Sequence, residues 1–124
     1  MTTARLHFDM VVIGFGKGGK TLAGAYAKTG KNVALIEQSS NMYGGTCINI
    51  GCVPTKALVH RADEFRASGE HNAEAADAAY ESAVIFRDKL TSAMRAKNRE
   101  ILESNATAKL IDGHARFLSD TEVE

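Results

Sequence analysis

Residues 8–37 read FDMVVIGFGKGGKTLAGAYAKTGKNVALIE, and their pattern decides the fold. Phe8–Ile13 is a nearly continuous apolar run, typical of a parallel strand that is buried on both faces. Lys20–Thr29 carries apolar residues at helical spacing, and Gly30 follows where a left-handed helix cap is expected. Asn32–Glu37 is a second apolar run. Together these segments predict a parallel strand–helix–strand unit and an α/β fold.

A glycine motif, Gly14-Phe15-Gly16-Lys17-Gly18-Gly19, lies between the first strand and the helix and fits the pattern G-x-G-x-x-G. Gly14 would permit a tight turn, Gly16 would let a pyrophosphate approach the backbone, and Gly19 would let the helix pack close to the strand. The helix N-terminus would then offer free N–H groups and a positive dipole end to the phosphates. A glycine-rich turn without a ligand is the alternative.

Glu37 ends the second predicted strand. At that position a carboxylate can accept hydrogen bonds from a ribose diol, and its charge disfavours a 2′-phosphate. Glu37 and the glycine motif therefore predict a dinucleotide site. These residues alone leave the identity of the nucleotide open.

The segment Gly44–Lys56 reads GGTCINIGCVPTK and contains both cysteines of the chain, Cys47 and Cys52. Residues five apart on a regular α-helix have Cα atoms roughly 8 to 9 Å apart, beyond the span that a disulfide tolerates. Gly51 permits unusual backbone angles, and Pro54 fits best in a first helical turn. We therefore expect a helix to begin, or to be distorted, at the cysteines.

A thiol at a helix N-terminus is stabilised as the reactive thiolate, which favours Cys52 over its partner as a persistent thiolate. Lys56 lies one turn later on the same helical face and would add positive charge. Gly44 and Gly45 would leave room for a flat cofactor. A site for a soft metal ion and two unrelated thiols are the alternatives, but His60 lies beyond the next turn, so we expect no bound metal.

The rest of the chain predicts a polar loop, two helices and two short strands. Helical spacing of apolar residues with charges between them favours one long amphipathic helix. Weak alternation near the C-terminus favours a last strand with a turn at Ser119–Asp120. The expected ranges are a loop at 38–43, a helix from Cys52–Pro54 to Ala67, a helix from Ala75 to about Ser104, and strands at Ala108–Ile111 and His114–Val123.

The long helix carries both apolar residues and a basic run. Tyr80 and Phe86 are expected to be helix-packing residues. Arg95, Lys97 and Arg99 have acidic neighbours, so a solvated face is favoured over contact with nucleic acid.

The composition of the 124 residues suits a globular domain, with 44% hydrophobic residues. Fifteen basic and fifteen acidic side chains cancel, so no global field would attract nucleic acid or an anionic membrane. Residues Met1–Asp9 are largely polar or charged, and the apolar run Met10–Ile13 is too short for a signal peptide or a membrane span. We therefore expect a cytoplasmic protein, in which a close cysteine pair is more often catalytic or metal-binding than structural.

The run Tyr43–Lys56 and the glycine motif resemble the pyridine nucleotide–disulfide oxidoreductases, a family that includes dihydrolipoamide dehydrogenase, glutathione reductase and mercuric reductase. They look most like bacterial reductases linked to reactive-chlorine and metal stress. The resemblance implies that the nucleotide is FAD and that NAD(P)H binds to a second domain. The implied substrate is a small molecule, a disulfide or a metal ion, and the implied assembly is a homodimer.

The resemblance also implies roles for individual residues. Cys52 would face the flavin in a charge-transfer complex, Cys47 would attack the substrate, and Lys56 would lie near the flavin's reducible nitrogen. No histidine of this chain would serve as acid or base, because the family takes its His–Glu pair from a dimerisation domain. The implied cofactor-binding residues are Gly14, Gly16, Gly19, Glu37, Gly45, Thr46, Gly113, His114 and Ala115.

By this resemblance, residues 1–124 are the N-terminal part of a Rossmann-like FAD-binding domain, without the rest of that domain, the NAD(P)H domain and the dimerisation domain. We expect the isolated segment to be inactive and the whole enzyme to pass electrons from NAD(P)H through FAD to the disulfide of Cys47 and Cys52. The alternatives are a non-catalytic nucleotide-binding fragment and part of a metal-ion reductase. Lys17 and Leu22 depart from the family's usual residues.

Overall fold

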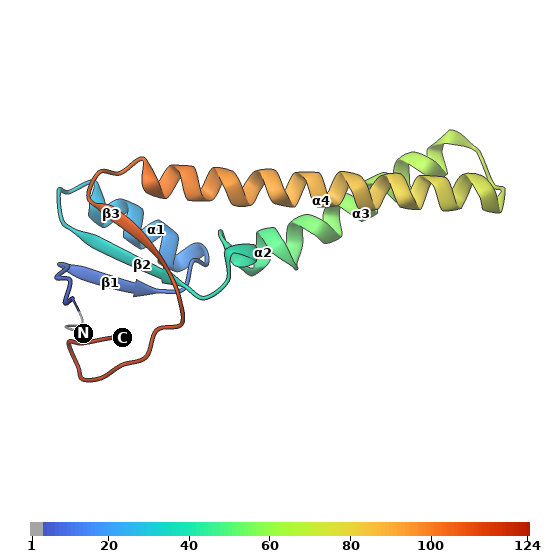
Figure 1. Cartoon of the computed structure of the whole chain (residues 1–124). Coiled ribbons are helices and arrows are strands. Elements are labelled where there is room, and N and C mark those ends of the chain that lie inside the picture. The colour runs from blue at the N-terminus through green and yellow to red at the C-terminus, as the bar shows by residue number, and fades with distance from the viewer. Residues whose placement is uncertain (1–3) are drawn as a thin grey trace.

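A three-stranded parallel sheet lies at one end of the molecule, and a pair of long helices projects away from it (Figure 1). The computed structural model describes residues 4–124, so the first three residues of the polar N-terminal stretch lie outside the description. The strands follow the order β1-β2-β3, in which β1 is Met10–Ile13, β2 is Val33–Glu37 and β3 is Ala108–Asp112. The predicted α/β fold with a parallel strand–helix–strand unit is confirmed.

Helix α1 (Lys17–Ala27) connects β1 to β2 and begins earlier than the expected range Lys20–Thr29. The last residues of the glycine motif form its first turn, which apolar periodicity does not reveal. Gly30 follows the helix with φ of 85°, so the expected left-handed position is confirmed.

The two predicted strands differ in burial. Strand β2 is buried throughout, with Val33 and Leu35 fully inaccessible. Strand β1 was expected to be buried on both faces, but Val11 is 40% exposed and Ile13 is 47% exposed. Its other residues pack against the core beneath α1, so β1 is an edge strand that is covered on one face within residues 4–124.

After β2 the chain forms a 3₁₀ turn η1 (Ser40–Met42), a one-turn helix α2 (Thr46–Asn49) and then the helices α3 (Cys52–Ser68) and α4 (Ala73–Glu103). The predicted start of a helix at the second cysteine and the single long helix are confirmed. At the start of α4 the side chain of Asn72 accepts a hydrogen bond of 2.8 Å from the Ala75 N–H, a typical N-cap.

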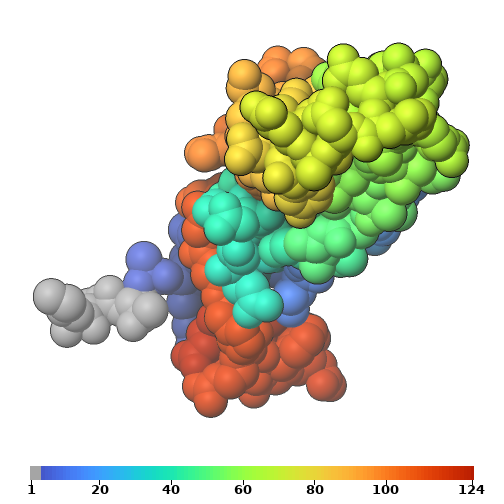
Figure 2. All heavy atoms as spheres, turned by 90° about the vertical axis from the view of Figure 1, so that its right-hand side faces the viewer, coloured from blue at the N-terminus to red at the C-terminus, as the bar shows by residue number. Residues whose placement is uncertain are grey.

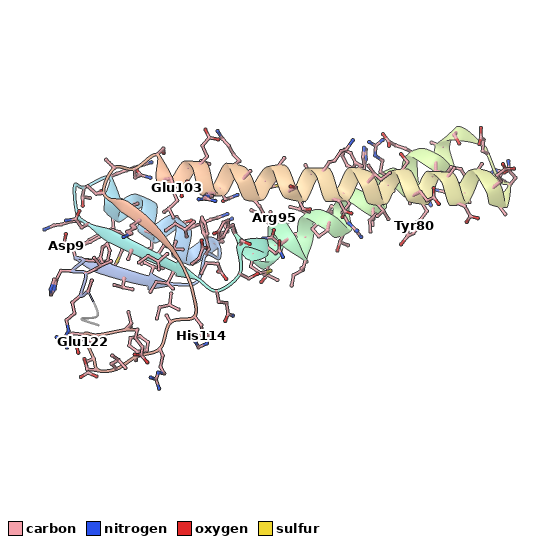
Figure 3. The ribbon with its side chains drawn as sticks, viewed as in Figure 1. Asp9, Tyr80, Arg95, Glu103, His114 and Glu122 are labelled. Carbon is pink, nitrogen blue, oxygen red and sulfur yellow. The ribbon has the colours of Figure 1, made fainter. Side chains whose placement is uncertain are left out.

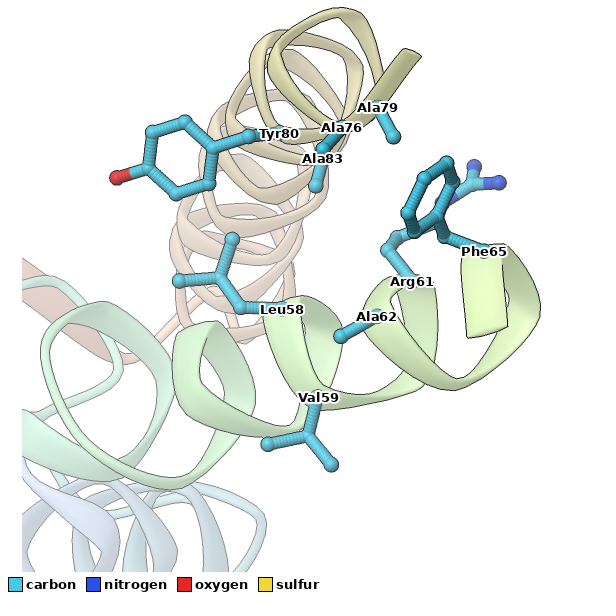
Figure 4. A pocket seen from close by; sticks show the side chains of 9 residues that line it. All are labelled: Leu58, Val59, Arg61, Ala62, Phe65, Ala76, Ala79, Tyr80 and Ala83. Carbon is cyan, nitrogen blue, oxygen red and sulfur yellow. The ribbon is translucent and has the colours of Figure 1, made fainter. Parts of the chain in front are cut away.

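Helices α3 and α4 form the projecting hairpin, and a groove of about 360 Å³ lies between them (Figure 4). In the groove Leu58 and Ala62 of α3 lie opposite Ala83 of α4. The expectation that Tyr80 is a packing residue is wrong, because its side chain is 65% exposed at the edge of this groove. Phe86 is half-buried beneath the Arg61 guanidinium, which lies 4.1 Å from the ring centroid. Within residues 4–124, none of the helices combines the length and the apolar character that a membrane span requires.

The strand expected at His114–Val123 does not form. The segment folds back on itself in a turn, where Phe117 and Val123 make an isolated antiparallel bridge and Arg116 pairs with Glu124. Phe117 remains 69% exposed. The segment therefore buries too little apolar surface against the sheet to add a strand to it.

We predict that Gly19→Ala lowers the free energy of unfolding by ~1–3 kcal/mol. A Cβ at Gly19 would lie 2.4 Å from the Gly14 carbonyl oxygen and 3.0 Å from Val12 Cγ1, so α1 must shift away from β1. Gly18→Ala is the matched control in the same turn, because its Cβ meets no atom within 4 Å, and stability should stay unchanged or rise by up to about 1 kcal/mol. Urea unfolding of both variants checks this, and equal effects would contradict the packing role of Gly19.

Candidate functional site

The candidate cofactor-binding residues lie at the C-terminal edge of the sheet, where the three parallel strands end. Gly14 follows β1 and its N–H donates to the Ile36 carbonyl at 2.8 Å. Gly113 follows β3 and its N–H donates to the Glu37 carbonyl at 2.9 Å. His114 and Ala115 come directly after it. This edge is where open α/β sheets bind their ligands.

The carboxylate of Glu37 connects the end of β2 to the glycine motif. It is 9% exposed, and its two oxygens accept hydrogen bonds from the Phe15 N–H at 2.9 Å and from the Ser39 N–H at 3.1 Å. A carboxylate has about four acceptor positions. The two backbone donors therefore leave capacity for a ribose diol, which remains a prediction for Glu37.

The glycine motif provides an open backbone surface in front of α1. Gly14 has φ of 99°, as its predicted tight turn requires. Gly16 is the N-cap residue of α1 without a side-chain cap, and a Cβ built on it meets no atom within 4 Å. The first N–H groups of the helix lack intrahelical acceptors and bear its positive dipole end. This site fits the pyrophosphate of a dinucleotide such as FAD.

The turn before the cysteines packs directly against the glycine motif. A Cβ on Gly45 would lie 2.7 Å from Gly16 Cα, so the two backbones touch only because Gly45 lacks a side chain. A Cβ on Gly44 would lie 2.7 Å from Ile48 Cδ1 and 3.1 Å from Asn98 Cγ. Protein atoms therefore occupy the side of each glycine where a side chain would stand, and the room expected here for a flat cofactor stays a prediction. Thr46 follows Gly45 and begins α2 with an exposed side chain.

The two cysteines belong to two different helices. Cys47 lies in α2, whereas Cys52 is the first residue of α3. Between them the Thr46 carbonyl accepts hydrogen bonds from both the Ile50 and Gly51 N–H groups, at 3.0 and 2.8 Å, which ends the first helix. The predicted distortion at the cysteines is confirmed. Both thiols are free and exposed. The segment that contains them runs from turquoise to green in Figure 2.

The pKa of the Cys47 thiol is raised. The largest cause is its hydrogen bond with the Cys52 side chain, followed by desolvation and by repulsion from the Cys52 charge, while a hydrogen bond with the Cys52 backbone and the positive charge of Lys17 oppose the rise. Cys52 thus contributes most to the surroundings of the Cys47 thiol. Lys56 is exposed one turn along α3, on the helix that Cys52 begins. Within residues 4–124 no group of three or more His, Cys, Asp or Glu side chains converges on a possible metal position.

Tyr43 is a site residue that the sequence did not reveal. Its ring packs on Phe15 with a centroid distance of 5.3 Å, and its hydroxyl donates a hydrogen bond to the Asp112 carboxylate. Burial, the hydrogen bond and the negative charge of Asp112 raise the pKa of Tyr43 to about 12. Tyr43 thus joins the glycine motif to the end of β3.

The basic run on α4 divides into two kinds of residue. Lys97 and Arg99 form exposed ion pairs with acidic residues of the same helix, as a solvated face would. Arg95 was expected on that face, but its guanidinium donates to Asn49 Oδ1 at 3.2 Å, at the place where α4 passes over α2 (Figure 3). Asn49 in turn donates from Nδ2 to the carbonyl oxygens of Tyr43 and Gly45, at 3.0 and 2.7 Å. Arg95 therefore supports the cysteine turn.

Known proteins resemble the chain over most of its length. A family model described as pyridine nucleotide-disulphide oxidoreductase matches residues 8–123. The chain is 43% identical over 113 residues to the probable pyridine nucleotide-disulfide oxidoreductase RclA of Escherichia coli. This match covers 91% of the chain and 23% of that protein. It is 36% identical over 122 residues to glutathione reductase of Schizosaccharomyces pombe, covering 94% of the chain and 26% of that protein.

A solved structure also matches. The Cu(II) complex of the HOCl-induced flavoprotein disulfide reductase RclA from Escherichia coli superposes with a TM-score of 0.80 and 42% identity, covering 94% of this chain and 24% of that one. The chain thus spans about a quarter of the length of these relatives.

We predict that Tyr43→Phe removes a pH-dependent part of the stability. Folded Tyr43 has a pKa of about 12, against about 10 for an unfolded tyrosine, so the folded chain holds this proton more tightly. This stabilisation is complete below about pH 10 and is lost as the pH rises from about 10 to about 12. Unfolding free energies of wild type and Tyr43→Phe across this range should converge at the alkaline end.

The absorbance of ionised tyrosine checks the same prediction, because the late titration step should vanish in Tyr43→Phe. Tyr80→Phe is the control, since Tyr80 is 65% exposed, and it should keep that step. A late step that survives in Tyr43→Phe would show that another residue holds the proton.

Proposed function

The chain belongs to the pyridine nucleotide-disulphide oxidoreductase family, and we propose that it is the part of such an enzyme that binds FAD and carries the redox-active pair Cys47 and Cys52. The observation that supports this proposal most directly is the contact between Gly45 and Gly16. It holds the beginning of the cysteine segment against the loop that suits a pyrophosphate. A cofactor bound at the glycine motif would therefore lie beside the thiols.

We assign the cofactor contacts from the arrangement at the sheet edge. FAD, when bound, supplies the capacity to accept two electrons as hydride from NAD(P)H and to deliver them to a disulfide. The α1 N-terminus would neutralise the pyrophosphate, and Glu37 would accept from the ribose. The proposed contacts are Gly14, Gly16 and Gly19 around the pyrophosphate, Gly45 and Thr46 along the pyrophosphate and flavin, and Gly113, His114 and Ala115 at the adenine.

The thiols carry out the exchange in this proposal. Two electrons and two protons open the Cys47–Cys52 disulfide to two thiols. The Cys47 thiolate then attacks a sulfur of the substrate disulfide and releases one substrate thiol. Cys52, as thiolate, attacks Cys47 in the mixed disulfide, which releases the second substrate thiol and restores the pair. The position of Cys52 at the start of α3, with Lys56 one turn later, supports its assignment as the thiol that faces the flavin.

Metal ions are a second candidate substrate class. One similar structure is a Cu(II) complex, and a mercuric reductase of Streptomyces lividans is 31% identical over 135 residues. Turnover of the intact protein with disulfides, hypohalite-derived oxidants and metal ions separates the classes.

We further propose that residues 1–124 are one part of an FAD-binding domain in a cytoplasmic homodimer, whose other domains bind NAD(P)H and supply the acid–base pair.

A non-catalytic fragment is the remaining alternative, because β1 leaves Val11 and Ile13 exposed on one face of the sheet. If the 124-residue chain alone oxidised NADH at the rate of an ordinary enzyme with a dye acceptor, this alternative would be excluded.

We predict that anaerobic two-electron reduction of the FAD-loaded intact protein produces a long-wavelength absorbance band from a thiolate beside the flavin. Cys52→Ser should abolish the band because it removes the flavin-facing sulfur. Cys47→Ser, the matched control five residues away, has no disulfide to reduce, so it should show the band before any reduction while losing disulfide turnover. A band that persists in Cys52→Ser would refute the assignment of the two thiols.

A further inference from the structure

The cysteine turn depends on a lysine from another element. The carbonyl oxygens of residues 42, 43 and 45 accept hydrogen bonds from donors within the segment 45–49. The Gly44 carbonyl instead accepts from Nζ of Lys20, at 3.2 Å, and Lys20 lies on α1. A buried carbonyl without a partner is costly, so this bond matters to the turn.

Lys20 is itself held from the opposite side by α4. Its Nζ donates to Asn98 Oδ1 at 2.7 Å, while Asn98 Nδ2 donates to the Met94 carbonyl at 2.8 Å, which fixes the orientation of the amide. Burial and the nearby charge of Lys17 lower the pKa of Lys20, and the charge of Cys47 opposes this shift. The ammonium thus joins α1, the turn and α4 at one point.

This junction acts on one side of the cysteine pair. Gly44 and Gly45 have φ of 90° and 94°, so this unusual backbone sets the direction in which α2 and Cys47 leave the turn. Cys52 is the first residue of the separate helix α3. The cations that interact with Cys47 are Lys17 and Lys20, both on α1.

We propose that Lys20 is a positioning residue for Cys47: held by Asn98, its ammonium fixes the Gly44–Gly45 turn from which α2 and Cys47 leave, and it places a positive charge on the Cys47 side of the pair. This role deepens the proposed function, because it raises the reactivity of the thiol assigned to attack the substrate. Cys47 alkylation requires no electron transfer, so the role can fail while the assignment of the flavin-facing thiol holds.

The test measures iodoacetamide alkylation of single thiols at pH 7 in the intact, reduced protein. With Cys52→Ser as background, Lys20→Met should slow alkylation of Cys47 about three- to tenfold, because charge and anchor are both lost. Lys20→Arg should restore the rate to within about twofold of the lysine form. With Cys47→Ser as background, Lys20→Met should change alkylation of Cys52 by less than about twofold.

Two further variants keep the test decisive. Lys28→Met removes an exposed lysine just beyond α1 and should leave Cys47 unaffected. Asn98→Ala keeps the charge of Lys20 but removes the side chain that holds its ammonium, so alkylation of Cys47 should slow about two- to threefold. This variant is the decisive one if circular dichroism shows that Lys20→Met is unfolded. Equal slowing of both cysteines, or equal rates at Cys47 for Lys20→Met and Lys28→Met, would overturn the proposal.

Discussion

The close backbone contact between Gly45 and Gly16 is the constraint on which the site depends. A Cβ at Gly45 would come within 2.7 Å of Gly16 Cα, and φ of 94° with ψ of −177° is accessible essentially to glycine alone. Any side chain there would push the cysteine turn away from the start of α1. The distance between the thiols and a pyrophosphate at the glycine motif therefore depends on the absence of a side chain at Gly45.

Around this contact, polar bonds join the ends of the three strands into one unit. Phe15 is held at its N–H by Glu37 and at its ring by Tyr43, and Tyr43 in turn bonds Asp112 at the end of β3. Contacts within the protein thus hold the conformation of the glycine loop. Such preorganisation reduces the entropy lost on binding and increases affinity without additional contacts.

The sequence predicts features that depend on near neighbours and misses those that depend on distant ones. The buried β2, the left-handed Gly30 and the helix start at Cys52 follow from a few adjacent residues, and the structure has all three. The bond from Lys20 to Asn98 spans 78 positions, and the bond from Arg95 to Asn49 spans 46. Periodicity treats such side chains as solvated, because it contains no information on which elements meet. The same limit explains the exposed face of β1.

The two thiols differ because their surroundings have different origins. Cys52 takes its environment from the helix that it begins, which is a local property. Cys47 follows a turn that three distant residues hold in place. Gly16 precedes α1, Lys20 lies on α1, and Arg95 of α4 acts through Asn49. On one regular helix the sulfurs would share an environment and lie too far apart to bond. The break at residues 50–51 instead places the cysteines in two helices, so that each thiol has surroundings of its own.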